Sequence, residues 1–200
     1  ILSLLETRVL GTLVEKQRTV PDTYPLSLNT LAAGCNQKTS RQPVLEAGEP
    51  EILLAVENLK ELGLVSEVSG SRVVRFAHNF EKVLGVPTQA SALLTVLMLR
   101  GPQTAGELRL NCERLHKFAD ISAVEAFLEE LAARSDGALV IELPRLPGAR
   151  ENRWAHLLSG QPAIESGSGG RGEASSAQEI DELRSRVAVL ESEVGALREI

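Results

Sequence analysis

The tetrapeptide RFAH (Arg75–His78) recurs in the second half of the chain as RWAH (Arg153–His156). Working outward from these phrases, LAAGC, which ends at Cys35, aligns with LRLNC, which ends at Cys112. A shared apolar skeleton near the start of each half consists of Val9, Leu10, Leu13 and Val14 in the first and Leu93, Leu94, Leu97 and Met98 in the second. Because the matches keep the same order along the chain, the sequence indicates an internal duplication.

Each repeat shows apolar periodicities that predict three helices followed by a β-hairpin. In the first repeat we expect helices at 4–16, 26–34 and 50–62, and hairpin strands at 64–68 and 72–77. In the second repeat we expect helices at 91–100, 105–112 and 123–134, and strands at 139–143 and 153–157. Capping boxes are predicted at the starts of three of these helices: Ser3 with Glu6, Thr104 with Glu107, and Ser122 with Glu125.

Three helices followed by a hairpin is the element order of a winged helix-turn-helix domain. We therefore predict a mainly α protein with small β-hairpins, made of winged-helix domains at 1–86 and 87–158, a flexible linker at 159–177 and a coiled-coil helix at 178–200. The linker is predicted from its Gly- and Ser-rich composition. No Gly-Lys-Ser/Thr sequence follows it, which argues against a phosphate-binding loop.

The last segment carries three heptads with β-branched residues at position a and leucine at position d, a pattern that favours a parallel two-stranded coiled coil. The flanking charges at positions g and e have opposite signs across such a dimer. We therefore expect a homodimer, with the apolar stripe docking onto the chain's own domains as the alternative. The residues expected at the dimer seam are Ile180, Leu183, Val187, Leu190, Val194 and Leu197.

Three longer phrases carry a family resemblance: VEKQRTVPDTYPLSLNTLAAGCNQKTSRQPV (Val14–Val44), the stretch Met98–Arg109, and RENRWAHLLSG (Arg150–Gly160). With them the chain resembles the YceH-like family of bacterial proteins over essentially its whole length. The resemblance implies tandem winged-helix domains. It assigns no activity, catalytic residue or binding residue to this sequence.

Composition and charge limit the partners that the chain can have. With 21 Lys and Arg against 27 Asp and Glu the net charge is −6, which excludes coating of nucleic acid by bulk positive charge. The longest apolar run, Ala92–Leu99, is shorter than the ~20 residues that span a bilayer. Two cysteines are too few for a disulfide framework, and no secretory signal precedes the first helix. We expect a cytoplasmic protein with no membrane partner.

DNA binding through the third helix of each repeat, the usual winged-helix mode, is opposed by the charge of these helices. Glu51, Glu57 and Glu61 dominate the first and Glu125, Glu129 and Glu130 the second. The loops and hairpins instead carry donors suited to phosphates, although scattered cations can also simply solvate loops. The candidate DNA contacts are Lys16, Arg18, Asn36, Gln37, Lys38, Thr39, Ser40, Arg41, Arg72, Arg75, Arg145 and Arg150.

We therefore predict a DNA-associated protein that resembles a transcriptional regulator, with double-stranded DNA as its partner. The alternative is a scaffold that binds partner proteins through acidic winged-helix domains. His78 and His156 occupy equivalent positions in the two repeats, and we interpret them as framework residues rather than catalytic ones. Cys35 and Cys112 read as buried small residues rather than reactive thiols. No catalytic constellation and no zinc-type Cys/His spacing is evident, so we expect a protein that is not an enzyme, with no cofactor and no metal.

Overall fold

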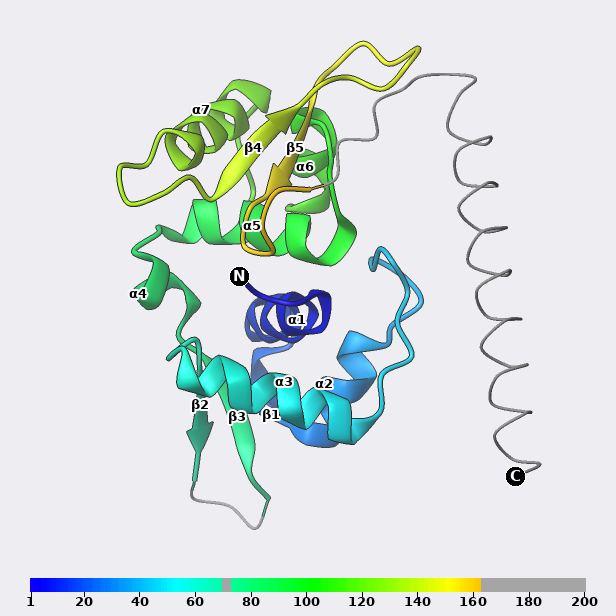
Figure 1. Ribbon diagram of the computed structural model, residues 1–200, viewed down its shortest axis with the longest axis vertical. Helices are drawn as coiled ribbons and strands as arrows, with labels where there is room; N and C mark the ends of the chain where they lie inside the picture. Colours follow the sequence, from blue (N-terminus) through cyan, green and yellow to red (C-terminus); the bar gives the residue numbers. More distant parts are fainter. Residues whose placement is uncertain (70–72, 163–200) are drawn as a thin grey trace, which may run out of the picture. The chain divides into compact units, whose positions relative to one another are not determined.

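The computed structural model describes residues 1–69 and 73–162 (Figure 1). In the first repeat, α1 (Leu4–Thr19) begins at Ser3, whose hydroxyl accepts a hydrogen bond from the Glu6 N–H while the Ser3 N–H donates to the Glu6 carboxylate. The predicted capping box is therefore confirmed. The elements that follow are the 3₁₀ turn η1 (Pro21–Thr23), β1 (Leu26–Ser27), α2 (Leu28–Cys35), α3 (Glu49–Glu61), β2 (Val65–Val68) and β3 (Arg75–His78).

The second repeat follows a short connecting helix, α4 (Phe80–Leu84), so the predicted boundary between residues 86 and 87 falls between α4 and the next helix. The Thr104–Glu107 capping box is confirmed. The Ser122–Glu125 box is wrong, because the last long helix begins earlier, at Ile121. Its cap is Asp120, whose carboxylate accepts a hydrogen bond from the Ala123 N–H at 2.8 Å. The elements are α5 (Thr88–Arg100), α6 (Ala105–Asn111), α7 (Ile121–Ala132), β4 (Val140–Leu143) and β5 (Arg153–His156).

The described residues thus form seven α-helices with two small antiparallel sheets, as the mixture of helical and hairpin patterns predicted. Residues Ile1–Ala163 make one compact unit that contains both repeats. The coiled-coil prediction at 178–200, with Ile180, Leu183, Val187, Leu190, Val194 and Leu197, lies outside the described residues, as does most of the predicted linker. No helix within 1–69 and 73–162 combines the length and apolar content needed to cross a bilayer.

The two hairpins pair in the same register. Val65 lies opposite His78 in the first, and Val140 opposite His156 in the second. The first sheet has a third strand that the sequence analysis missed, β1, which pairs Leu26 with Phe76. In the second repeat a single bridge between Gln103 and Trp154 takes its place. The duplication therefore extends from the sequence to the strand pairing.

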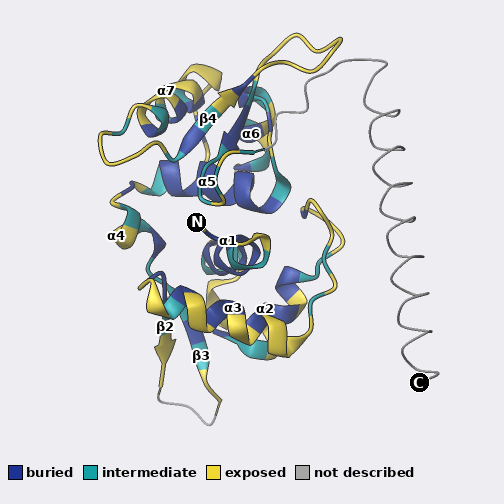
Figure 2. Cartoon of the chain, viewed as in Figure 1, coloured by how far each residue is buried: buried dark blue, intermediate teal, exposed yellow. Residues whose placement is uncertain are grey.

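Helix α1 lies at the centre of the unit and packs against α2 and α3 on one side and α5 on the other (Figures 1 and 2). Gly11 permits the close approach to α5, since a Cβ atom at this position would stand 3.0 Å from Cδ2 of Leu99. The repeats consequently share one apolar core. The apolar residues matched near the start of each repeat are all buried: Val9, Leu10, Leu13, Val14, Leu93, Leu94, Leu97 and Met98.

Candidate functional site

Two buried arginines hold the loop that follows α2. Arg8 of α1 is fully buried and donates to the carbonyl oxygens of Cys35 (3.1 Å) and Pro43 (2.6 Å). Arg41 is also buried, and its guanidinium meets both carboxylate oxygens of Glu15, at 3.1 and 2.5 Å. Because buried charges require such partners, residues 36–43, here named the 36–43 loop, are fixed onto α1.

Four of the predicted DNA contacts have their donors occupied within the protein. Arg41 is the buried partner of Glu15, and the Asn36 amide exchanges two hydrogen bonds with the Ala47 backbone. Arg18 pairs with Glu81 at 2.8 Å, and Arg75 donates to the carbonyl oxygen of Pro25 at 2.8 Å. We therefore assign structural roles to Asn36, Arg41, Arg18 and Arg75. Arg72 lies outside the described residues.

Four other predicted contacts come together in a cleft of about 220 Å³ between the repeats, here named the seam cleft. Lys16, Gln37, Thr39 and Ser40 line it from the first repeat. The second repeat contributes α5 and the end of α6 with the residues after it. Its contribution consists of Val96, Leu99, Arg100, Asn111, Arg114 and Leu115.

The seam cleft is positively charged. Lys16, Arg100 and Arg114 line it, and the one carboxylate among its described lining residues, Glu15, is engaged by Arg41 and lies 3.5 Å from Lys16. The 36–43 loop also bonds to the second repeat, because the Gln42 N–H donates to the Leu99 carbonyl oxygen at 2.8 Å. Lys38, next to Gln37 in this loop, is exposed.

A second concave surface, of about 440 Å³, lies between α3 and the hairpin of the first repeat and is here named the α3 groove. Its apolar lining consists of Leu28, Leu53, Val73, Val74 and Phe76. Its polar lining consists of Ser27, Asn29, Glu49, Glu57 and Glu67, with no cation among them. Lys60 of α3 bridges Glu57 and Glu67 at 3.0 and 2.8 Å, which leaves the groove with an excess of negative charge.

The second repeat has a groove in the equivalent place, here named the α7 groove, of about 450 Å³. Trp154 opposite Glu142 corresponds there to Phe76 opposite Glu67. The lining differs, because the predicted contacts Arg145 and Arg150 meet there with acidic side chains. The polar and apolar residues of the α7 groove are Ala105, Ile121, Glu125, Glu142, Arg145, Arg150, Glu151, Asn152 and Trp154.

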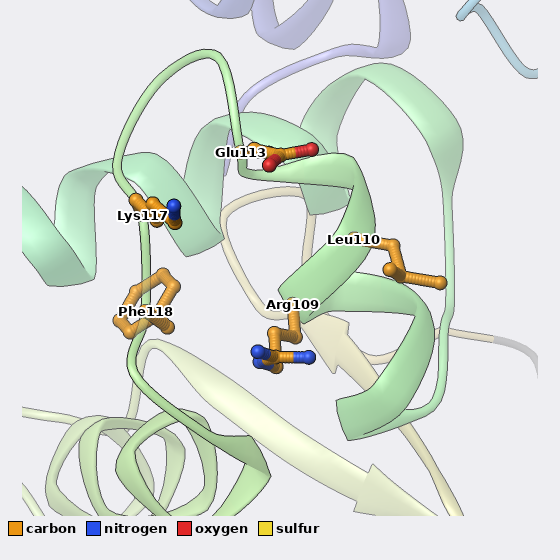
Figure 3. Close-up of a pocket in the computed structure, with 5 residues that line it drawn as sticks. All are labelled: Arg109, Leu110, Glu113, Lys117 and Phe118. Carbon is orange, nitrogen blue, oxygen red and sulfur yellow. The ribbon is translucent and has the colours of Figure 1, made fainter.

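A third hollow, of about 60 Å³, lies between α6 and the loop after it (Figure 3). Arg109 and Leu110 come from α6, and Lys117 and Phe118 from the facing loop. Arg109 donates to the Ala119 carbonyl oxygen at 3.1 Å, and the ring of Phe118 is buried. This volume suits water rather than a substrate.

The repeat-equivalent histidines are both partly buried, and the repeat-equivalent cysteines are both buried. Burial lowers the pKa of His78 to about 4 and that of His156 to about 4. The Tyr24 hydroxyl accepts from the His78 N–H at 2.7 Å and so pins its loop to the hairpin. Burial raises the pKa of Cys35 to about 11 and that of Cys112 to about 12, so both stay protonated at neutral pH. Within the described residues no cluster of His, Cys, Asp or Glu could hold a metal ion.

Comparison with known proteins places the chain in a family. Residues 2–149 match the family described as protein of unknown function, DUF480. The chain belongs to the DUF480 family. This agrees with the YceH-like resemblance of its sequence.

This DUF480 chain is similar to proteins called UPF0502 in several bacteria. The UPF0502 protein of Dechloromonas aromatica (strain RCB) is 77% identical over 197 residues, which cover 98% of this chain and 92% of the relative. A UPF0502 protein of Burkholderia thailandensis is 58% identical over 199 residues, covering 98% and 85%. That of Methylibium petroleiphilum is 66% identical over 164 residues, covering 82% and 70%.

Proposed function

We propose that this DUF480 protein is a tandem winged-helix scaffold that binds a partner protein through its first repeat. The architecture is supported by the order of elements, since three helices and a hairpin occur twice with the same strand register. The third strand β1, which enters the sheet just before α2, also fits a winged helix. Fold alone does not choose a partner, so the choice depends on the grooves.

The observation that carries the proposal is the chemistry of the α3 groove. In winged-helix proteins that bind DNA, the third helix meets the phosphate-lined major groove. Here the same face is apolar and rimmed by Glu49, Glu57 and Glu67. Leu53 and Val74 in this groove keep 39% and 48% of their surface exposed, although burial would remove apolar area from water. An apolar groove with a negative rim repels DNA and suits a protein.

The partner that fits is a basic amphipathic segment. Its apolar side chains would occupy the floor around Leu53 and Phe76, and its Lys or Arg side chains would meet the glutamate rim. The chain's own C-terminal segment at 178–200 fits less well, because its sequence carries more Asp and Glu than Lys and Arg. The occupant is therefore a separate protein.

The test compares two helical model peptides, one of Leu and Lys and one of Leu and Glu in the same order, by fluorescence anisotropy against the full chain. We expect only the Leu/Lys peptide to bind, and Leu53→Asp to weaken it roughly tenfold through loss of apolar contact. Because Leu53→Asp adds a negative charge, simple attraction to an acidic protein would strengthen binding instead. Leu110→Asp, at a 68% exposed position on α6 outside the groove, is the matched control.

Binding that Leu53→Asp leaves unchanged, or an absence of binding to the Leu/Lys peptide, would refute the α3 groove as a protein site.

DNA association is the second candidate function, because Lys38 is exposed on the 36–43 loop beside residues of the positive seam cleft. For this candidate, binding to a mixed-sequence duplex should weaken steeply with salt, and Lys38→Ala should flatten that dependence. No binding at low salt would eliminate it.

A further inference from the structure

We infer that the seam cleft binds a small phosphorylated anion. This site is separate from the α3 groove, and neither proposal depends on the other. The residues that carry it are Lys16, Arg100 and Arg114, together with the hydroxyl groups of Thr39 and Ser40.

The first argument is electrostatic. The protein as a whole is acidic, yet Lys16, Arg100 and Arg114 line one cleft. Within the described residues neither Arg100 nor Arg114 forms a salt bridge with a carboxylate. Glu15, which could offset them, already meets the buried Arg41. An anion entering the cleft would therefore find two guanidinium groups, those of Arg100 and Arg114, whose charge no carboxylate of the described residues neutralises.

The second argument is that the donors of the 36–43 loop are already held in place. Arg8 and Arg41 fix the 36–43 loop to α1, and the hydrogen bond from Gln42 to Leu99 fixes it to α5. Ser40 has a φ of 59°, a conformation that residues other than glycine seldom adopt and that is found preferentially at functional sites.

The Ser40 hydroxyl accepts a hydrogen bond from Arg100 at 2.7 Å, so its own proton is available to an anion oxygen. Donors that are ordered before binding lose little entropy when a ligand arrives. The loop geometry therefore favours an anion at Ser40 and Arg100.

The third argument is size and chemistry. Pockets for drug-sized ligands measure roughly 300–1,000 Å³, whereas the seam cleft measures about 220 Å³. This space suits a phosphate group with a few further atoms. Guanidinium groups match phosphate oxygens through paired hydrogen bonds, which favours phosphate over a halide ion.

Both repeats supply ligand-binding groups, with Lys16 and Ser40 from the first and Arg100 and Arg114 from the second. An anion bound between them would stabilise the folded seam, because a ligand that binds only the native state raises its stability. The prediction is therefore a rise in melting temperature as well as binding.

The experiment titrates the full chain with inorganic phosphate and with inorganic pyrophosphate, at neutral pH and at an ionic strength held constant with chloride. Calorimetry and thermal unfolding are the two readouts. We expect saturable binding with a matching rise in Tm. Arg114→Ala should weaken it roughly tenfold, which is the effect of losing one charge-assisted hydrogen bond. Arg114 is exposed, and within the described residues its side chain makes no hydrogen bond or ion pair, so this variant should fold normally.

Arg145→Ala, which removes an exposed arginine of the α7 groove, is the matched control and should bind like the wild type. Tighter binding of pyrophosphate would identify a diphosphate-bearing ligand, and tighter binding of phosphate a monoester, either of which supports the site. No saturable binding of either anion, or an equal loss in Arg114→Ala and Arg145→Ala, would overturn the proposal.

Discussion

Arg8 of α1 and Arg41 bring two positive charges into the interior, and the carboxylate of Glu15 forms an ion pair with Arg41. Burial, and then the charge of Arg41, lowers the pKa of Arg8. The guanidinium of Arg8 donates hydrogen bonds to the carbonyl oxygens of Cys35 and Pro43. Although burial opposes ionisation, Arg41 and Lys16 hold the pKa of Glu15 below its ordinary value. At the scale of single residues, the 36–43 loop is therefore held in place by two buried arginines, through hydrogen bonds from Arg8 and the ion pair of Arg41 with Glu15.

Removing Arg41 should leave Glu15 with its longer contact to Lys16, at 3.5 Å, in place of the buried ion pair. We expect Arg41→Met to lower the free energy of unfolding by about 3 kcal/mol, measured by urea denaturation. The double variant Arg41→Met with Glu15→Met should recover much of this loss, because it removes both charges. Lys38→Met, at an exposed position of the same loop, is the control. Equal stability of Arg41→Met and Lys38→Met would contradict the buried pair.

His78 and His156 make stability depend on pH. In the unfolded chain a histidine gains a proton near its ordinary pKa of about 6.5, whereas burial keeps both neutral in the folded protein down to pH about 4. Their contribution is therefore complete above pH about 6.5 and is lost as the pH falls toward 4, by about 1–2 kcal/mol for each partly buried ring.

The measurement is the urea midpoint across this pH range. His156→Gln should reduce the slope of this midpoint with pH, and the double variant His78→Gln with His156→Gln should reduce it further. A slope that is the same in all three proteins would assign the pH dependence to other groups.

At the scale of elements, the two hairpins keep one register while the grooves beside them diverge. Glu67 faces Phe76 in one and Glu142 faces Trp154 in the other. The α3 groove is mainly apolar with glutamates, and the α7 groove mixes both signs of charge. The strand register matches, so the difference in chemistry comes from the side chains and from the connection between β4 and β5, which supplies Arg145 and Arg150 to the α7 groove. This difference would let the two repeats hold different partners.

Substitutions at the start of α7 test whether Asp120 or Ser122 caps this helix. Asp120→Ala should lower the free energy of unfolding by about 1 kcal/mol, since the Ala123 N–H loses its acceptor. Ser122→Ala should change it by a few tenths at most, because Ser122 lies inside the helix. Thermal or urea unfolding of the two variants measures these changes. A larger loss of stability in Ser122→Ala than in Asp120→Ala would support the cap at Ser122 that the sequence predicted.

At the scale of the whole molecule, the heptads from which a dimer is predicted, at 180–197, lie outside the compact unit Ile1–Ala163. A chain truncated before Gln161 should keep the circular dichroism of folded repeats and be a monomer by light scattering, whereas the full chain should be a dimer. A dimer that survives the truncation would show that the heptads are not the assembly device.

The features that the sequence predicted are those encoded locally. The capping boxes at Ser3 and Thr104 need residues only three positions apart, and the hairpins ending at His78 and His156 need only alternating patterns. What could not be predicted depends on distant partners. Strand β1 is two residues long and exists because β3 pairs with it.

Arg41 was expected at the surface because its loop is polar, and its burial depends on Glu15 in α1. The seam cleft and the α3 groove each combine residues from several elements, so single motifs could not reveal them. The acidic character of α3 was the one local signal that pointed toward a protein partner.

The missing side chain at Gly11 brings α1 so close to Leu99 that each repeat completes the interior of the other. Either half produced alone would expose this face to water and should aggregate. A polypeptide nicked between Gly85 and Thr88 should instead persist as a noncovalent heterodimer, recoverable by mixing the two fragments during refolding. Complementation of this kind would show that the fold does not require the peptide connection between the repeats. The connection would still ensure that both repeats are made in equal amounts.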